Sequence, residues 1–219
     1  MNASVLNSRC PLCESDQLAL YHRDAKRPYQ QCANCQLVFV EHNYHLNSAA
    51  EKAEYDLHQN HPGDPGYRNF LQRLATPLAT RLAAGSRGLD FGCGPGPTLS
   101  LMLEELGHTV SLYDIFYAVN ERVWQCRYQF ITATEVVEHL SQPGRELLRL
   151  WRHLEPGGIL AVMTKRVINP ERFASWHYKN DPTHICFFSE QSFEWLGHQW
   201  GVKPEFIGGD IVLFTKPAV

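Results

Sequence analysis

The stretch that decides the fold is Leu89-Asp90-Phe91-Gly92-Cys93-Gly94-Pro95-Gly96-Pro97. The residues before it predict a short strand at 88–91, and the apolar pattern after it predicts a helix at 98–106. Its three glycines allow a sharp turn and let the backbone approach a ligand that a Cβ would exclude. Because the helix directs its unpaired N–H groups at the same point, the turn predicts a ligand site.

A carboxylate at the end of the next expected strand extends this site. Asp114 comes 20 residues after Gly94, where an acidic side chain can accept hydrogen bonds from ribose hydroxyls. The glycine spacing is Gly-x-Gly-x-Gly, and Asp90 precedes the first glycine by two residues. A carboxylate there is unfavourable beside a dinucleotide pyrophosphate and compatible with the sulfonium and ammonium groups of S-adenosylmethionine. A nicotinamide-dependent oxidoreductase is therefore the weaker alternative.

Helical and strand patterns alternate from residue 67 onward, which predicts an α/β fold with a mostly parallel sheet. Helices are expected at residues 67–84, 98–106, 145–154 and 189–200. Strands are expected at residues 88–91, 109–113, 128–134 and 159–164. The tail, residues 206–215, predicts an antiparallel hairpin.

Residues 67–219 resemble class I S-adenosylmethionine-dependent methyltransferases. Their first motif is similar to residues 89–96, and residues 128–140 with Pro156-Gly157-Gly158 are similar to their fourth strand and the turn before the fifth. The resemblance implies a Rossmann-like sheet that binds S-adenosylmethionine. One departure is that only 13 residues separate Asp114 from Tyr128, so the third-strand region is expected to be shortened or absent.

The same resemblance assigns the cofactor-binding residues. Gly92, Gly94 and Gly96 would admit the methionine end of the cofactor, and Asp90 would face its positive groups. Asp114 would hold the ribose. The residue that contacts adenine stays unassigned because the third-strand region is short, and Glu121 is only a weak candidate.

An acid–histidine segment, Thr134-Glu135-Val136-Val137-Glu138-His139, follows the strand expected at 128–134. Side chains at the carboxyl edge of such a sheet face the ligand, and the resemblance places Glu135 beside the methyl donor. A second polar segment, residues 176–184, follows the next strand and ends in His184. We expect Glu138, His139 and His184 to be the catalytic residues, with a histidine accepting the acceptor's proton. The alternative is that they only hold the loop together by hydrogen bonds.

The acid–histidine pattern also resembles the segment with which small-RNA 2′-O-methyltransferases bind a divalent cation. Glu135, Glu138, His139 and His184 match that segment in residue type. The net charge of −3 and the absence of a basic patch speak against a nucleic-acid acceptor. This variant therefore stands as an alternative to a small-molecule acceptor.

Four cysteines at the start of the chain form two Cys-x-x-Cys pairs. Cys10 and Cys13 are separated from Cys32 and Cys35 by 18 residues, a spacing typical of a zinc ribbon. Four thiolates leave no open coordination position, so the zinc is expected to be structural. The alternatives are two disulfides or four unrelated thiols. Similar four-cysteine heads occur on methyltransferases that act on small metabolites.

Length and composition bound the organisation of the chain. With 219 residues, of which 44% are hydrophobic, it fits one main domain and a small appendage. We expect a zinc ribbon at residues 1–40, a linker with a short helix near 48–58 at residues 41–66, and the main domain at 67–219. Residues 1–6 lack the pattern of a signal peptide, and no apolar run is long enough to span a membrane. A cytoplasmic location follows as an expectation.

The sequence therefore predicts an S-adenosylmethionine-dependent methyltransferase that acts on a small molecule. The alternative from another class is a catalytically inactive module in which the ribbon binds a protein or a nucleic acid. The acceptor and the oligomeric state are not determined by these patterns.

Overall fold

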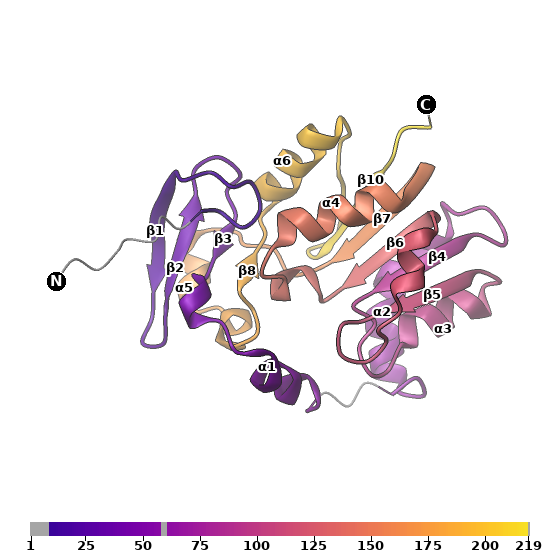
Figure 1. Cartoon of the computed structure of the whole chain (residues 1–219), viewed down its shortest axis with the longest axis horizontal. Coiled ribbons are helices and arrows are strands. Elements are labelled where there is room, and N and C mark those ends of the chain that lie inside the picture. The colour runs from indigo at the N-terminus through magenta and orange to yellow at the C-terminus, as the bar shows by residue number, and fades with distance from the viewer. Residues whose placement is uncertain (1–8, 58–60, 219) are drawn as a thin grey trace.

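The computed structural model describes residues 9–57 and 61–218 (Figure 1). The expectation that residues 1–6 do not form a signal peptide, and the expected end of the linker helix at His58, concern residues outside those described. Among the helices that are described, none has both the length and the apolarity needed to cross a bilayer.

The larger of two sheets carries the turn at residues 92–97. Its strands are β4 (Arg87–Phe91), β5 (Thr109–Tyr113), β6 (Tyr128–Thr134), β7 (Leu154–Met163), β9 (Glu205–Ile207) and β10 (Ile211–Thr215). They lie in the order β5-β4-β6-β7-β10-β9. The first four are parallel, and the β9–β10 hairpin joins antiparallel to β7. The expected α/β sheet with a C-terminal antiparallel hairpin is confirmed.

Helices cover both faces of this sheet. They are α2 (Pro65–Ala79), α3 (Thr98–Glu105), α4 (Pro143–His153) and α6 (Glu190–Trp200). On β7, Ile159 and Ala161 belong to the core that α2 and α3 cover, whereas Leu160 and Val162 belong to the opposite core with α4 and α6. Successive strand residues point to opposite faces, so one apolar strand serves two cores. That explains the continuous apolar run in the sequence.

The third-strand region is short, as the spacing predicts. Residues 115–127 are all described, and they form a turn bridged between Asp114 and Ala118 followed by the 3₁₀ helix η2 (Glu121–Gln125) instead of a strand. Trp124 packs edge-on against Tyr113, with 4.9 Å between ring centroids. Strand β5 is therefore an edge of the sheet, and an aromatic residue covers its end.

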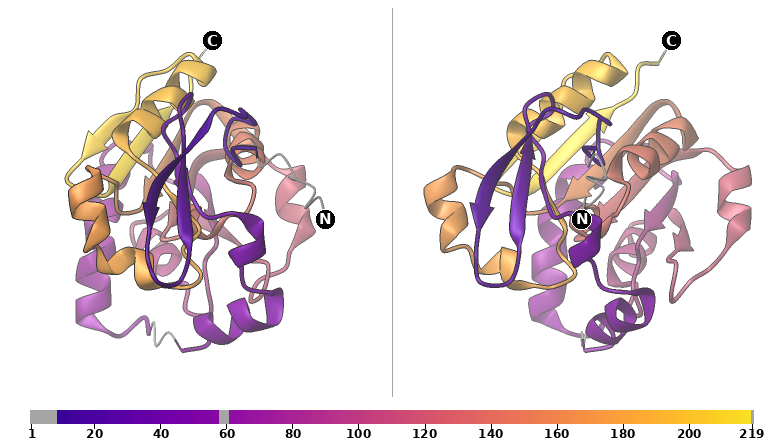
Figure 2. Two further views of the ribbon diagram at one scale, coloured as in Figure 1. Left: turned by 90° about the vertical axis from the view of Figure 1, so that its left-hand side faces the viewer. Right: turned by 60° about the vertical axis from the view of Figure 1, so that its left-hand side comes forward.

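The smaller sheet combines three N-terminal strands with one strand from much later in the sequence. Its strands are β1 (Leu18–Arg23), β2 (Pro28–Cys32), β3 (Val38–Phe39) and β8 (Cys186–Phe187), in the order β1-β2-β3-β8. Val38 pairs with Phe187 and Phe39 with Cys186. Strand β3, which follows the hairpin β1–β2, therefore pairs with a strand from much later in the chain. Figure 2 shows the hairpin in two further views. The buried residues of this sheet belong to the same core cluster as α4 and α6.

The connecting segment crosses from the small sheet toward the large one (Figure 1). It contains the 3₁₀ helix η1 (His42–Tyr44) and helix α1 (Ser48–Tyr55). The Asn47 side chain caps α1 by accepting a hydrogen bond from the amide of Ala50 at 3.0 Å. The Tyr117 hydroxyl donates to Asp56 at 2.7 Å. These contacts hold α1 over the end of β5.

Three further short helices complete the description of the chain. They are η3 (Val137–His139), α5 (Pro170–Ala174) and η4 (His177–Asn180). The first follows β6, and the other two follow β7. The acid–histidine segments therefore sit where strands of the parallel sheet end.

Candidate active site

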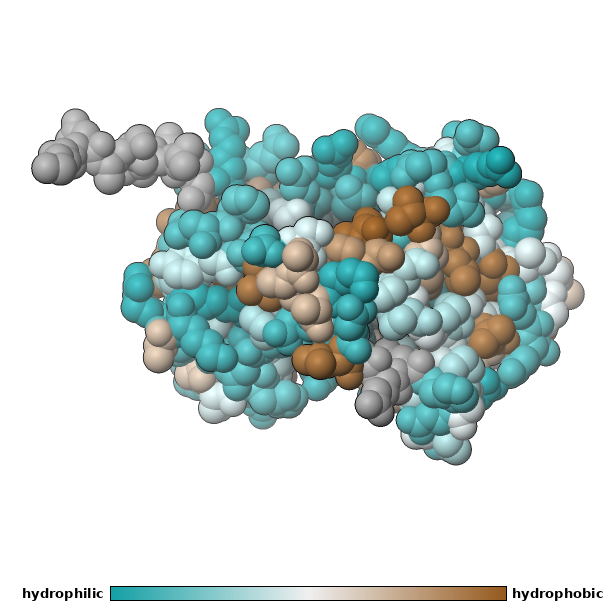
Figure 3. Space-filling view, turned by 60° about the horizontal axis from the view of Figure 1, so that its bottom comes forward, coloured by the Kyte–Doolittle hydropathy of each residue, from teal (hydrophilic) through white to brown (hydrophobic). Residues whose placement is uncertain are grey.

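A cavity of about 560 Å³ lies at the carboxyl ends of the parallel strands. Each of β4 to β7 contributes to its lining from the residues at or just past its end, and α1 closes it from the linker side. These strand-end residues are Gly92, Asp114, Glu135 and Lys165. Figure 3 shows the face on which α1 lies, where hydrophobic residues form separate groups across the middle between hydrophilic areas. The volume is in the range of small-molecule and cofactor sites.

The glycine turn forms one wall of the cavity. Gly92 and Gly94 have φ angles of +72° and +63°, which side chains with a Cβ rarely adopt. A Cβ on Gly92 would collide with the side chain of Val136, whereas a Cβ on Gly94 would meet no atom of residues 9–57 or 61–218 within 4 Å. The two positions therefore need glycine for different reasons: Gly92 for packing against the next loop, and Gly94 for access to the cavity.

Asp114 ties the turn to the end of β5. Its Oδ2 accepts a hydrogen bond from the Gly94 amide at 3.0 Å. Its Oδ1 accepts from the amides of Phe116 at 2.8 Å and Tyr117 at 3.1 Å. An ionised carboxylate has about four acceptor positions, so the three backbone bonds leave capacity for a ribose hydroxyl. The predicted ribose role of Asp114 fits this geometry.

Asp90 lies deeper than the other predicted cofactor residues. It is 4% exposed, and its Oδ1 accepts a hydrogen bond from the Thr132 hydroxyl at 2.7 Å. Burial raises the pKa of this carboxyl to about 6. Neither Asp90 nor Gly96 belongs to the residues that line the cavity, so their contacts with a cofactor stay predictions.

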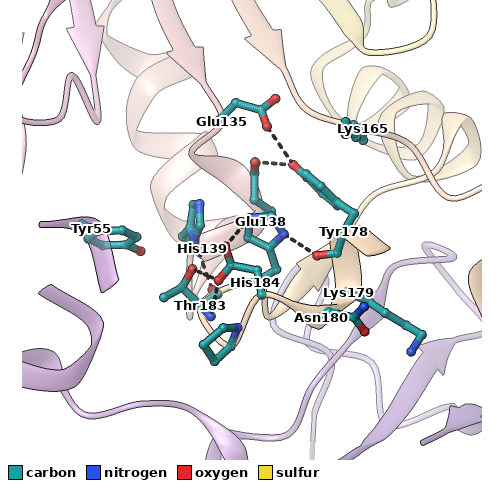
Figure 4. A network of polar contacts seen from close by, with 12 residues as sticks. Tyr55, Glu135, Glu138, His139, Lys165, Tyr178, Lys179, Asn180, Thr183 and His184 are labelled. Atoms are coloured by element: carbon teal, nitrogen blue, oxygen red, sulfur yellow. Dashed lines mark hydrogen bonds and ion pairs between the residues drawn. The ribbon is translucent and has the colours of Figure 1, made fainter. Parts of the chain in front are cut away.

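The opposite wall begins with a strained residue. Glu135 directly follows β6 and has a φ of +52°, an unusual conformation for a residue other than glycine. Its amide donates to the carbonyl of Met163 at 2.8 Å. Backbone strain of this kind is concentrated at functional sites, where the surrounding structure holds it in place. Here it directs Glu135 into the cavity (Figure 4).

A tyrosine joins the two glutamates of this segment. The Tyr178 hydroxyl donates to Oε1 of Glu138 and lies 3.4 Å from Oε2 of Glu135 (Figure 4). Glu138 is fully buried, and its Oε2 has no hydrogen-bond partner among the described residues. Burial raises the pKa of Glu138, and the neighbouring Glu135 adds to this effect. A proton shared within this group lowers the cost of burying two carboxyls together.

The two predicted histidines lie together in the cavity lining. The ring centroids of His139 and His184 are 4.7 Å apart. His139 Nδ1 is 3.2 Å from the carbonyl oxygen of Thr183, and His184 Nδ1 is 2.7 Å from the carbonyl oxygen of Tyr178. Burial lowers the pKa of His184, although Asp181 opposes this effect. The neutral imidazole is thus favoured at His184, and that is the form able to accept a proton.

Sequence reasoning missed the contribution of α1. Glu51 and Tyr55 line the cavity, and the Tyr55 hydroxyl donates to Glu51 at 2.8 Å. The Tyr55 ring packs edge-on against His139, with centroids 5.3 Å apart. The i, i+4 spacing of Glu51 and Tyr55 places both on one face of a helix, and this spacing is the only signal that the sequence offered. Nothing in the local pattern indicated which element that face would cover.

The four predicted zinc ligands converge at the base of the small sheet. Their Sγ atoms all lie within 4.8 Å of one another. The Cys10–Cys35 pair is separated by 3.4 Å and the Cys13–Cys32 pair by 3.5 Å. Tetrahedral zinc with bonds of about 2.3 Å would place sulfur atoms ~3.8 Å apart, so the donor set fits the metal with a small expansion. All seven cysteines are free thiols, which speaks against the two-disulfide alternative.

A second group of potential ligands lies in the cavity wall. One ligand atom each from Glu138, His139 and His184 lie within 4.8 Å of one another. Carboxylate and imidazole are donors that several divalent metals accept. Glu135 is not a member of this group, so three of the four residues named for the divalent-cation alternative are brought together.

Comparison with known proteins agrees with the fold. A family model described as a methyltransferase domain matches residues 64–205. This match extends over more than half of the chain, so the protein belongs to the methyltransferase domain family. No curated protein matches it.

Many solved structures resemble the chain, including the following two, both at low sequence identity. The 1,6-didemethyltoxoflavin-N1-methyltransferase of Burkholderia thailandensis, with 1,6-didemethyltoxoflavin and S-adenosylhomocysteine bound, is 17% identical with a TM-score of 0.55. That match covers 90% of this chain and 98% of the other. A proposed sarcosine dimethylglycine methyltransferase of Galdieria sulphuraria is 14% identical with a TM-score of 0.51, covering 78% and 99%. Both confirm a class I methyltransferase fold.

Proposed function

We propose that this protein transfers a methyl group from S-adenosylmethionine to a small-molecule acceptor. The observation that carries the proposal is one cavity with two unlike walls. The glycine turn and Asp114 form the first wall, and Glu135, His139 and His184 form the second. The family match and the S-adenosylhomocysteine bound to the Burkholderia thailandensis relative support the choice of cofactor.

The first wall suits a nucleoside with a positively charged tail. Gly94 offers open space at the turn, and Asp114 has spare acceptor capacity for a ribose hydroxyl. Asp90 beneath the turn and Glu135 across from it supply negative charge toward a sulfonium or an ammonium group. A cation held between them would favour the ionised form of both carboxyls.

The second wall suits proton removal from the acceptor. S-adenosylmethionine, when bound, supplies an activated methyl group, and transfer makes the acceptor–carbon bond as the sulfur–carbon bond breaks. The chain holds the acceptor near the donor in a partly enclosed site, which lowers the entropic part of the barrier. His184, favoured as the neutral imidazole, accepts the proton when the acceptor atom carries one. His139 lies beside it as the second candidate base.

The small sheet is proposed to hold a structural zinc ion. Four sulfur donors within 4.8 Å of one another support this assignment. Four thiolates complete a tetrahedral shell, so the metal would take no part in methyl transfer. Its contribution would be to the folding free energy of a sheet with few buried residues of its own.

Calorimetry tests the cofactor assignment. The full chain is titrated with S-adenosylmethionine, S-adenosylhomocysteine and NAD. We expect both sulfur compounds to bind and NAD not to bind, whereas Asp114→Ala is expected to lose at least tenfold in affinity because it removes an acceptor and loosens the turn. Tight NAD binding without binding of either sulfur compound would overturn the proposal.

Transfer of labelled methyl groups separates an enzyme from a binding module. The protein and labelled S-adenosylmethionine are incubated with the small-molecule fraction of a cell extract. Incorporation into that fraction is expected, and a His184→Ala variant should incorporate less while it still binds S-adenosylhomocysteine. Cofactor binding without any incorporation into small molecules, RNA or protein would favour the catalytically inactive module.

A divalent cation in the second wall is the second candidate feature. The grouping of Glu138, His139 and His184 favours it, together with the unpartnered Oε2 of the buried Glu138. Such a cation would polarise an acceptor hydroxyl, such as that of a ribose in RNA. Mn²⁺ titration followed by electron paramagnetic resonance tests it: binding that Glu138→Gln abolishes supports the cation, and no binding removes it. RNA and the small-molecule fraction are then compared as methyl acceptors.

A further inference from the structure

A buried arginine of the small sheet contacts a loop that lines the cavity. Arg27 lies in the turn between β1 and β2 and is 7% exposed. Its guanidinium donates to four backbone carbonyl oxygens of a single distant loop, residues 179–184. These acceptors are Lys179 at 3.0 Å, Asp181 at 3.0 Å, Pro182 at 3.2 Å and His184 at 2.8 Å.

The turn that carries Arg27 is itself held in place. Asp24 Oδ1 accepts hydrogen bonds from the amides of Lys26 at 2.8 Å and Arg27 at 2.9 Å. Asp24 Oδ2 accepts from the Tyr29 hydroxyl and from Nζ of Lys179, both at 2.9 Å. The guanidinium Nε donates to the same Tyr29 hydroxyl at 3.2 Å. The small sheet thus fixes the position of Arg27, and its guanidinium donates to the carbonyl oxygens of residues 179–184.

The other surface of this loop forms the second wall of the cavity. Asp181 and His184 line the cavity, and the Thr183 carbonyl lies 3.2 Å from Nδ1 of His139. In Figure 4, His184 and Thr183 face the glutamates and His139, whereas Lys179 points away from them. The loop therefore places the side chains of Asp181 and His184 at the cavity, while four of its carbonyl oxygens accept hydrogen bonds from Arg27.

Four carbonyl dipoles that converge on one point repel one another unless a cation lies between them. The carbonyl oxygens of Lys179, Asp181 and His184 accept from Nη2 and that of Pro182 accepts from Nη1, so the two N–H groups of Nη2 are shared among three acceptors. Arginine suits this place because its planar guanidinium spreads one positive charge over several N–H donors in fixed directions, with Nε left for the Tyr29 hydroxyl. A lysine would supply the charge with only three donors from a single atom. A neutral side chain would leave several buried carbonyls without partners, and each of these is costly.

We propose that Arg27 is a positioning residue for the acceptor wall, and that it holds Asp181 and His184 at the cavity from within the small sheet. This inference rests on the proposed function for its catalytic consequence. It implies that the cysteine-rich head, residues 9–40, is part of the catalytic unit. Among the described residues, neither the glycine turn nor Asp114 forms a hydrogen bond with Arg27, so we expect loss of Arg27 to disturb the acceptor wall and not the cofactor wall.

The test compares Arg27→Met and Arg27→Lys with Arg23→Met in the full, metal-loaded chain. Arg23 lies in the same hairpin, is exposed and serves as the control. Three measurements are made: hydrogen–deuterium exchange of residues 177–185, the dissociation constant of S-adenosylhomocysteine, and methyl transfer into the extract fraction at saturating cofactor. If Arg27 only supports the overall fold, its loss should change all three measurements together. If it positions the acceptor wall, exchange in residues 177–185 and methyl transfer should change while the dissociation constant of S-adenosylhomocysteine does not.

For Arg27→Met we expect at least tenfold faster exchange in residues 177–185, at least tenfold slower transfer, and cofactor affinity within twofold of wild type. Arg27→Lys should lie between, and Arg23→Met should match wild type. Unchanged exchange in this loop, or a parallel loss of cofactor affinity, would overturn the inference. If Arg27→Met does not fold, Arg27→Lys and Lys179→Met carry the same comparison.

The outcomes also distinguish this inference from the proposed function. If the wild-type chain neither binds S-adenosylhomocysteine nor transfers a methyl group, the proposed function fails. The exchange measurement still decides the role of Arg27 in that case. Faster exchange confined to residues 177–185 would support it, and exchange that is unchanged or equally faster everywhere would refute it.

Discussion

At the scale of single residues, the cavity depends on backbone conformations that most residues avoid. Gly92, Gly94 and Glu135 all have positive φ angles at neighbouring strand ends. The first two are glycines, for which this conformation carries no steric penalty. Glu135 has to be held there by its neighbours. The three positive φ angles therefore all lie at the carboxyl ends of β4 and β6, the edge of the sheet that forms the cavity.

The two glycines of the turn provide a matched pair of substitutions. Both Gly92→Ala and Gly94→Ala force alanine to a positive φ, at a shared cost of about 1 kcal/mol. Only Gly92→Ala also collides with Val136, so we expect it to lower the free energy of unfolding by a further ~1–3 kcal/mol. Gly94→Ala should instead weaken S-adenosylhomocysteine binding and lose only the ~1 kcal/mol of stability that both variants share. Urea unfolding and calorimetry measure the two effects, and equal stabilities would contradict this assignment.

Asp90 provides a prediction about pH. Its pKa is raised from 3.8 to about 6 in the folded state, so the folded chain holds this proton more tightly than the unfolded chain does. The contribution of Asp90 to stability is thus present below pH ~4 and is lost as the pH rises through about 6. Asp90→Asn removes this loss and is expected to stabilise the free protein at pH 7 by up to about 3 kcal/mol.

The measurement is the difference in free energy of unfolding between wild type and Asp90→Asn from pH 4.5 to 8. Taking the difference cancels groups that titrate equally in both proteins, the thiols of the proposed zinc site included. The amide oxygen can still accept the Thr132 hydrogen bond. A difference in free energy that does not change with pH would show that folding does not raise the pKa of the Asp90 carboxyl.

At the scale of elements, the small sheet docks through backbone contacts that side-chain patterns do not reveal. The N-terminal end of α4 approaches the first cysteine pair so closely that Gly144 donates its amide to the Pro11 carbonyl at 3.2 Å. A Cβ on Gly144 would collide with the backbone oxygen of Leu12. Strand β8 meets β3 on the other side of the same sheet.

Gly144→Ala tests this docking. Alanine in a helix is worth up to about 1 kcal/mol more than glycine, whereas the collision with a backbone atom costs about 1–3 kcal/mol. We therefore expect net destabilisation, measured by urea unfolding. Gly209→Ala is the control, because a Cβ there meets nothing within 4 Å. Stabilisation by Gly144→Ala would show that α4 does not lie against the cysteine pair.

At the scale of the whole molecule, the head and the large sheet share one core. The buried residues of β2 and β3 belong to the same cluster as those of α4, α6 and one face of the large sheet. A cluster that is continuous in this way unfolds cooperatively. The expected boundaries at residues 40 and 66 therefore separate stretches of sequence that pack together in space.

Metal removal is expected to affect the whole chain. The proposed zinc site predicts one zinc per chain. Cys35→Ser should lower this metal content and shift a single calorimetric transition to lower temperature, because losing a ligand removes folding free energy from the shared core. Cys126→Ser, at an exposed thiol, should change neither. Two separate transitions, with only the smaller one shifted, would show that the head folds independently.

The sequence by itself determined the parallel sheet, the glycine turn with Asp114 and the four cysteines, because each rests on local periodicity or short spacing. The helix expected at residues 189–200 is of the same kind, and α6 begins there with Ser189 as its N-cap. The tertiary structure decided which distant segments meet: Tyr55 beside His139, and Arg27 beneath the loop of His184. Such contacts depend on how whole elements pack across long sequence separations, and no pattern within either segment encodes its partner.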